Sequence, residues 1–175
     1  MLKSEIFKNM NLYGAVQIGS EFSWLLDKIS ELKSRKTAVE IGVYKGGTFY
    51  AFMQFFEKVI GIDIEEKVLS FKLRSDDQYI IGNSKDLNIV SKIPNNLDFL
   101  FIDGDHSYEG VYEDFNLWKI KVRKGGIIAL HDIVGADISG YKYGVRDFWA
   151  EIKKNYETDE IKNHEKYYGI GIIKK

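Results

Sequence analysis

The stretch Thr37–Gly47, TAVEIGVYKGG, decides the fold of this chain. Ala38, Val39 and Ile41 suit a buried strand, and the glycines that follow suit a loop leading into a helix. In open α/β sheets, ligands bind beyond the carboxyl ends of the strands, where glycine lets the backbone come close. The glycine spacing is not G-x-G-x-x-G, so the dinucleotide fingerprint is absent and a nicotinamide dehydrogenase is disfavoured.

Strand and helix patterns alternate through the rest of the chain. Apolar runs predict strands at Lys58–Ile64, Gln78–Gly82, Leu97–Asp103, Ile127–Leu130 and Tyr167–Lys174. Helical spacing predicts helices at Ile18–Leu32, Thr48–Glu57, Tyr108–Ile120 and Val145–Lys154. This alternation predicts an α/β fold with a Rossmann-like, doubly wound and mostly parallel sheet and helices on both faces. We expect one domain over residues 1–175, with 1–36 as an N-terminal helical cap and 37–175 as the core.

Composition excludes several classes of protein. The formal net charge is −1, from 25 Lys+Arg against 26 Asp+Glu, so nothing draws the chain toward nucleic acid. The absence of cysteine excludes disulfides, thiolate metal sites and a cysteine nucleophile. The first residues carry no apolar leader, and no window approaches 18 apolar residues. We therefore expect a soluble cytoplasmic protein with no membrane or nucleic-acid partner.

Polar residues after the second and third predicted strands suit a nucleoside. Asp63 follows Gly42 by 21 residues, and an acidic residue about 20 residues beyond a glycine turn binds a ribose diol. The alternative is that Asp63 caps a helix beginning near Glu65, but the spacing favours the ribose. Asn83 and Ser84 could contact an adenine edge, although Ser84 suits a helix N-cap equally well.

The densest polar chemistry follows the strands at Leu97–Asp103 and Ile127–Leu130. Two of the three histidines, His106 and His131, lie there with Asp103, Asp105 and Asp132. Both strands should end at the edge that holds the glycine turn. Because unpaired buried carboxylates are costly, we expect a cation or a polar substrate at this edge.

These motifs resemble those of a known family. Glu40–Gly47 with Asp63 resembles motifs I and II of the class I S-adenosylmethionine-dependent methyltransferases. FIDGDHSYEGVYEDF (Phe101–Phe115) with KGGIIALHDI (Lys124–Ile133) is similar to the family of macrolide-sugar O-methyltransferases and cephalosporin hydroxylase-like proteins. The resemblance runs from about Gln17 to the C-terminus. It implies the class I methyltransferase fold, with the last strand antiparallel, and S-adenosylmethionine as cofactor. The cofactor-binding residues it implies are Glu40, Gly42, Val43, Tyr44, Gly46, Gly47, Asp63, Ile64, Asn83, Ser84 and Asp103.

The same resemblance implies a catalytic role for Asp103 and His106 and a divalent metal, Mg²⁺ or Mn²⁺. Asp103 and Asp132 would be metal ligands, with His131 in place of a family carboxylate, and His106 would be the general base. Because Mg²⁺ prefers oxygen ligands, either His131 stays off the metal, or the site prefers manganese or iron, or the metal is lost. A two-histidine, one-carboxylate iron site that includes His106 is a minor alternative.

The leading hypothesis is an O-methyltransferase that acts on a hydroxyl of a small molecule, such as a sugar, a glycan or a natural-product precursor. The alternatives are a metal-dependent oxygenase or hydrolase and a non-catalytic nucleotide-binding module. A homodimer could complete the acceptor pocket. The loop Gly135–Gly144, with Tyr141 and Tyr143, is either a lid or a plain connection. The loop Met10–Gln17 is favoured as a surface connector, although its Tyr13 and Gln17 could reach a ligand.

Overall fold

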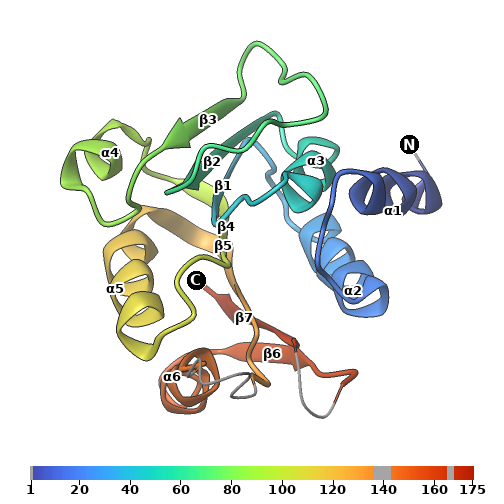
Figure 1. Cartoon of the computed structure of the whole chain (residues 1–175). Coiled ribbons are helices and arrows are strands. Elements are labelled where there is room, and N and C mark those ends of the chain that lie inside the picture. Colours follow the sequence, from blue (N-terminus) through green and yellow to red (C-terminus); the bar gives the residue numbers. More distant parts are fainter. Residues whose placement is uncertain (1, 136–142, 165–167) are drawn as a thin grey trace.

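A computed structural model describes residues 2–135, 143–164 and 168–175. These residues form a seven-stranded sheet in the order β3-β2-β1-β4-β5-β7-β6, with helices on both faces (Figure 1). Strands β1 to β5 are parallel, and β7 is antiparallel to β5 and β6. The strands are β1 (Thr37–Ile41), β2 (Lys58–Asp63), β3 (Gln78–Ile81), β4 (Leu97–Ile102), β5 (Val122–His131), β6 (Thr158–Ile161) and β7 (Ile170–Lys174). The helices are α1 (Lys3–Leu12), α2 (Gly19–Ser30), α3 (Gly47–Met53), α4 (Leu87–Lys92), α5 (Tyr108–Trp118), the short 3₁₀ turn η1 (Lys119–Lys121) and α6 (Val145–Ile152).

The central strands are buried on both faces, as their continuous apolar sequences predict. Leu100 and Ile102 of β4 point into the core beneath α4, α5 and α6. Phe99 and Phe101 of the same strand point into the opposite core, beneath α1, α2 and α3. Figure 1 shows α1, α2 and α3 on one side of the sheet and α4 and α5 on the other. The predicted fold class, including the antiparallel last strand, is therefore confirmed.

The prediction that a helix begins near Glu65 is wrong. Residues 64–77 connect β2 to β3 without a helix. The apolar residues of this segment, Leu69, Phe71 and Leu73, recur at every second position and pack against the core beneath α1, α2 and α3. A period of two suits an extended chain, because alternate side chains of such a chain share one face.

Other differences concern short elements. Helix α1 and strand β6 were not predicted, and α1 extends into the predicted loop Met10–Gln17. Helix α4 was predicted only as a possible helix start with Ser84 as its N-cap. Strand β5 begins at Val122 rather than Ile127. The N-cap of α4 is Asp86, whose carboxylate accepts a hydrogen bond of 2.8 Å from the Asn88 N–H. The single-domain organisation stays a prediction. None of the helices in the described ranges is long and apolar enough to cross a membrane.

Candidate cofactor and catalytic site

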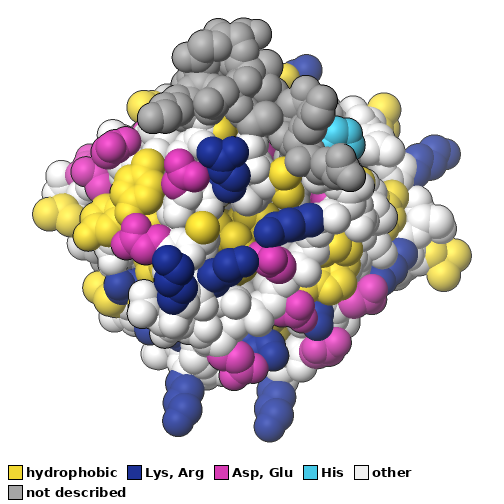
Figure 2. All heavy atoms as spheres, turned by 90° about the horizontal axis from the view of Figure 1, so that it is seen from below, with side chains coloured by type: hydrophobic (Ala, Val, Ile, Leu, Met, Phe, Trp, Pro, Cys, Tyr) yellow, Lys and Arg dark blue, Asp and Glu magenta, His cyan; other side chains and the backbone are white. Residues whose placement is uncertain are grey.

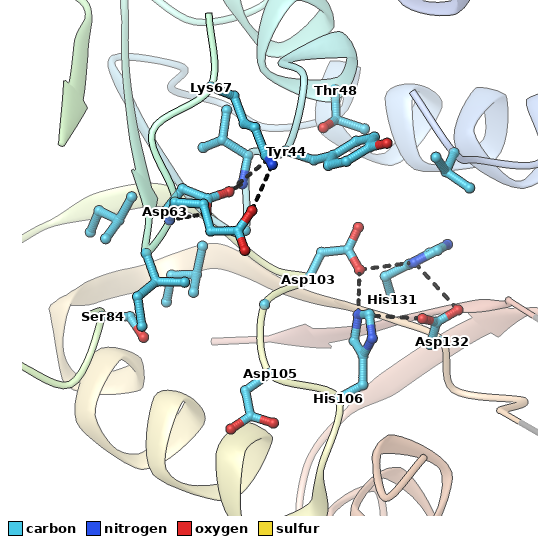
Figure 3. A pocket seen from close by; sticks show the side chains of 18 of the residues that line it. Tyr44, Thr48, Asp63, Lys67, Ser84, Asp103, Asp105, His106, His131 and Asp132 are labelled. Atoms are coloured by element: carbon cyan, nitrogen blue, oxygen red, sulfur yellow. Dashed lines mark hydrogen bonds and ion pairs between the residues drawn. The ribbon is translucent and has the colours of Figure 1, made fainter. Parts of the chain in front are cut away.

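A cavity of about 700 Å³ lies at the carboxyl ends of the parallel strands. Its wall comes from the α1–α2 connection, the turn after β1 and the segments that follow β2, β3, β4 and β5. In Figure 3, Asp63 and Ser84 lie on one side of the site, and Asp103, His106, His131 and Asp132 lie on the other. The strand ends therefore bring together the residues that the sequence suggested for two different tasks.

Two positions of the glycine turn, Gly42 and Gly46, have no room for a side chain. Gly42 has φ +85°, and a Cβ atom there would lie 2.0 Å from the Asp103 carbonyl oxygen. Gly46 has φ +88°, and its Cβ would lie 2.7 Å from Cδ2 of Leu69. Positive φ and close backbone approach are the two conditions that require glycine. Gly42 lines the cavity, whereas Gly46 lies behind its wall.

Asp63 holds the turn in shape. Its Oδ2 accepts hydrogen bonds from the N–H groups of Val43, at 2.9 Å, and Tyr44, at 2.8 Å. Its Oδ1 accepts one of 2.9 Å from the Glu65 N–H. The helix-cap alternative is wrong, because no helix begins near Glu65. A carboxylate can accept about four hydrogen bonds, so Asp63 retains capacity for a ribose hydroxyl.

Glu40 lies behind the cavity wall. It is fully buried, and one of its oxygens accepts a hydrogen bond from the Thr48 hydroxyl. Burial raises the pKa of Glu40 well above its usual range, and the charges of Asp103 and Asp63 add to this effect. The predicted cofactor residues that line the cavity are Gly42, Val43, Tyr44, Gly47, Asp63, Ile64, Asn83, Ser84 and Asp103.

Ser84 is held from behind by α5. Its hydroxyl donates to Asp114 Oδ1 at 2.6 Å, and its carbonyl accepts from the Trp118 indole N–H at 3.0 Å. The interpretation of Ser84 as a helix N-cap is wrong, because Asp86 caps α4. Burial raises the pKa of Asp114 to about 6. Asp114 was not predicted to support the site, although a carboxylate between Val111 and Phe115 on the apolar face of α5 was a detectable signal.

Two imidazoles meet one carboxylate oxygen at the far side of the cavity. Asp103 Oδ1 lies 3.0 Å from His131 Nδ1 and 3.2 Å from His106 Nε2. Asp132 lies within 3.5 Å of His131 Nδ1 and 3.4 Å of His106 Nε2 (Figure 3). The predicted catalytic and metal-binding residues are therefore in one cluster.

The charges in this cluster shift one another. Burial opposes ionisation of Asp103, but the charges and hydrogen bonds of His131 and His106 hold its pKa below its usual range. Burial likewise opposes the imidazolium forms, but Asp103 and Asp132 raise the pKa of His131 to about 9 and also raise the pKa of His106. Burial raises the pKa of Asp132. Asp103 is therefore the anionic centre of the cluster.

The residues present fit a divalent metal. Ligand atoms of Asp103, His131 and Asp132 all lie within 4.8 Å of one another. Two carboxylates and an imidazole suit Mn²⁺ or Fe²⁺ better than Mg²⁺. Among the described residues, His106 does not join this group, so the two-histidine iron alternative lacks support. His131 Nε2 is buried and finds no hydrogen-bond partner in the part of the chain described, whereas metal-binding histidines usually donate from their second nitrogen.

Aromatic rings pack on both histidines. Tyr143 stacks on His106 with ring centroids 5.2 Å apart, and Tyr168 lies 5.8 Å from His131. Tyr143 belongs to the loop that was predicted as a lid, but residues 136–142, with Tyr141, lie outside the described residues. Sequence reasoning missed Tyr168 and also the buried Glu21, which accepts hydrogen bonds from the Gly169 and Asn163 N–H groups. Glu21 adjoins Phe22 on the apolar face of α2, which was a detectable signal.

The sheet order, the glycine turn and the acidic residue that ends β2 are those of the class I methyltransferase fold. Residues 39–133 match the methyltransferase domain family, and the chain belongs to this family. This assignment favours the enzyme expected from the sequence over an oxygenase, a hydrolase or a non-catalytic module.

Similar proteins support the fold. The MycE methyltransferase from the mycinamycin biosynthetic pathway, in complex with Mg and SAH, superposes with a TM-score of 0.71 and 18% identity, over 98% of this chain and 54% of that chain. An rRNA methylase from Streptococcus thermophilus superposes with a TM-score of 0.66 and 11% identity, over 93% of this chain and 99% of that chain. Uncharacterized protein R132 of Acanthamoeba polyphaga mimivirus is 37% identical over 116 residues, 57% of this chain and 52% of that protein. The chain spans about half the length of R132 and of MycE.

Proposed function

We propose that this chain transfers a methyl group from S-adenosylmethionine to a hydroxyl group of a small molecule, such as a sugar or a natural-product precursor. The observation that carries the proposal is the position of His106 on the cavity wall. Its Nε2 lies 3.2 Å from Asp103, and its side chain is 27% exposed. A general base must reach the proton that it removes, and His106 lines the cavity in which the acceptor would bind.

Bound S-adenosylmethionine supplies an electrophilic methyl group on a sulfonium ion. As the acceptor oxygen forms its bond to the methyl carbon, the carbon–sulfur bond breaks, its electron pair stays on sulfur, and the hydroxyl proton moves to the free nitrogen of the neutral His106 imidazole. Asp103 and Asp132 stabilise the resulting imidazolium, because both carboxylates lie within 3.4 Å of His106 Nε2. Tyr143, stacked on the ring, holds its orientation.

Asp103, Asp132 and His131 would hold a divalent metal, which would lower the pKa of an acceptor hydroxyl. The mixed oxygen and nitrogen donor set favours manganese over magnesium in this proposal. MycE, which has a similar fold, has been crystallised in complex with Mg and SAH.

A small-molecule acceptor also agrees with the surface charge. On the face drawn in Figure 2, basic and acidic side chains are interspersed, whereas nucleic-acid binding uses a basic stripe. The homodimer and the cytoplasmic location remain part of this proposal. If light scattering on an active preparation shows only monomer, the proposal of a homodimer is wrong.

The test is calorimetric titration of S-adenosylhomocysteine into the protein without metal, with Mg²⁺ and with Mn²⁺. Assays with methyl-labelled S-adenosylmethionine on sugars and phenols would follow. We expect micromolar binding and label recovered as a methyl ether. An absence of binding under every metal condition would overturn the proposal.

A further inference from the structure

The backbone of Tyr168 is held in an unfavourable conformation at the wall of the cavity. In the part of the chain that the structure describes, the non-glycine residues with φ in the left-handed region are Tyr44, Asn96, Asp132 and Tyr168. Asparagine and aspartate adopt this region more readily than tyrosine does. Tyr44, Asp132 and Tyr168 all line the cavity, and strain of this kind concentrates at functional sites, where the surrounding structure enforces it. Tyr44 belongs to the turn held by Asp63, so the enforcement of Tyr168, with φ +64°, needs its own cause.

Hydrogen bonds on both sides of Tyr168 enforce its conformation. Its carbonyl oxygen accepts a hydrogen bond of 2.9 Å from the Val134 N–H, in the segment that follows β5. The N–H of the next residue, Gly169, donates to Oε2 of Glu21 at 3.0 Å. Oε1 of Glu21 accepts a second hydrogen bond, of 2.7 Å, from the Asn163 N–H. Glu21 therefore ties the backbone beside Tyr168 to α2.

Glu21 contributes position rather than packing. Its side chain is fully buried in the first turn of α2, and a buried carboxylate is unfavourable unless it accepts hydrogen bonds. Phe22 and Leu25 of the same helix supply the apolar packing. What the carboxylate adds to this packing is the pair of hydrogen bonds to the Asn163 and Gly169 N–H groups.

The Tyr168 ring lies beside the catalytic cluster. Its centroid is 5.8 Å from that of the His131 ring, with 34° between the two planes. Asp63 and Ser84, which suit the nucleoside, lie on the other side of the site from His131 (Figure 3). Tyr168 is therefore on the side of the cavity that remains for the acceptor. An aromatic side chain on a cavity wall offers a broad apolar face, and another ring uses that face best.

We propose that the ring of a cyclic acceptor packs against Tyr168, and that Glu21 is the positioning residue that holds Tyr168 in place. The inference rests on the proposed function, since it assigns residues to the acceptor of the methyl group. It commits that function to a hydroxyl group carried on a ring, the chemistry that sugars and phenols share.

The first experiment measures the position of the ring and needs no acceptor. The ring current of Tyr168 displaces the NMR signals of the His131 imidazole C–H protons, and Tyr168→Leu abolishes this displacement. We expect Glu21→Gln to change the same signals in the same direction, because an amide has one acceptor oxygen and turns N–H donors toward a backbone N–H group. Unchanged His131 signals in a folded Glu21→Gln variant would overturn the positioning role.

Asp98→Asn is the matched control for Glu21→Gln. Asp98 is also a buried carboxylate that accepts hydrogen bonds from two backbone N–H groups, those of Lys36 and Thr37. It lies near the start of β4, at the opposite end of the strand from the cavity. Asp98→Asn should lower the melting temperature and leave the His131 signals in place.

The second experiment measures methyl transfer from labelled S-adenosylmethionine to a panel of monosaccharides and phenols, with glycerol as an acyclic hydroxyl compound. We expect Tyr168→Leu and Glu21→Gln each to raise the KM of the methylated cyclic compound about tenfold. The affinity for S-adenosylhomocysteine should change less than about twofold. Tyr168→Phe, which keeps the ring, should retain the wild-type KM within about twofold. In the double variant, Glu21→Gln should add less than about twofold to the effect of Tyr168→Leu, because the residue that it positions is gone.

An unchanged KM in Tyr168→Leu, or full additivity in the double variant, would overturn the inference and leave methyl transfer standing. So would methylation of glycerol as readily as of the cyclic compounds, or of no cyclic compound by protein that binds S-adenosylhomocysteine. Protein that binds no S-adenosylhomocysteine under any metal condition would instead defeat the proposed function, and this inference with it. Thermal unfolding checks that each variant is folded. If Glu21→Gln does not fold, Glu21→Asp, whose carboxylate is one methylene too short for both N–H groups, should show the same rise in KM.

Discussion

The Nδ1 atom of His131 lies 3.0 Å from Oδ1 of Asp103, because the parallel register of β4 and β5 sets the ends of the two strands side by side. Burial disfavours the charged imidazole, but Asp103 raises the pKa of His131 to about 9. The two side chains therefore form an ion pair at neutral pH when no metal is bound. A metal ion and this proton compete for the same nitrogen.

Manganese affinity should therefore rise with pH. Below the raised pKa of His131, the metal must displace a proton, so we expect the affinity to rise by up to about tenfold per pH unit toward pH 9. Titration calorimetry with Mn²⁺ at several pH values measures this. His131→Glu should bind Mg²⁺ more tightly and lose most of the pH dependence, because a third carboxylate replaces the imidazole. An affinity of the wild type that is the same at pH 7 and pH 9 would contradict the prediction.

His106→Gln should slow methyl transfer without weakening cofactor binding. Loss of a general base lowers kcat by about 10²–10⁴, and we expect S-adenosylhomocysteine affinity to change less than about twofold. Steady-state kinetics and calorimetry separate the two effects. His164→Gln is the matched control, because His164 is exposed and far along the chain from the cluster. A loss of S-adenosylhomocysteine affinity as large as the loss of kcat would show that His106 acts on the structure of the cavity.

The pH profile of the wild-type enzyme should reflect the same base. Asp103 and Asp132 outweigh burial and raise the pKa of His106, and a base must be neutral to accept a proton. The rate should therefore rise with pH through a value above the ordinary histidine pKa of about 6.5. The profile of kcat, measured with saturating cofactor, tests this, and a midpoint below the ordinary value would contradict it.

Asp63→Ala should weaken S-adenosylhomocysteine binding by roughly 10–100-fold. The substitution removes the acceptor proposed for the ribose and also frees the Val43 and Tyr44 N–H groups, which disorganises the glycine turn. Calorimetry measures the loss. Asp76→Ala removes an exposed carboxylate from the β2–β3 connection and should leave the affinity unchanged. Full affinity in Asp63→Ala would contradict the prediction.

Asp114→Asn should stabilise the protein above neutral pH. Burial raises the pKa of Asp114 to about 6, above its value in the unfolded chain, so stability falls as the pH rises from about 4 to about 6. The amide avoids this cost, and we expect the free energy of unfolding to rise by roughly 2–3 kcal/mol at pH 8. The gain should shrink as the pH is lowered toward 4. Urea unfolding at both pH values measures it, with the exposed Glu113→Gln as the control.

Much of the site was predictable because strand ends are marked in the sequence. Gly42, Asp63 and Asp103 each directly follow or end an apolar run, and Asp132 comes two residues after one; parallel strands bring such positions to one edge of the sheet. A helix beginning near Glu65 was expected because Asp63 is a residue type that caps helices. In the structure Asp63 accepts a hydrogen bond from the Glu65 N–H without a helix, as an aspartate also does in an isolated turn.

The sequence by itself determined the sheet, its polar edge and the residue types available for methyl transfer, because these follow from local periodicity and from the order of the strands. Only the tertiary structure decided which atoms meet. It placed Glu40 behind the wall, turned Ser84 toward Asp114 and brought Gln17 to Asp103 across 86 residues of sequence. Such contacts depend on how helices pack against the sheet, and packing joins residues whose sequence separation carries no pattern.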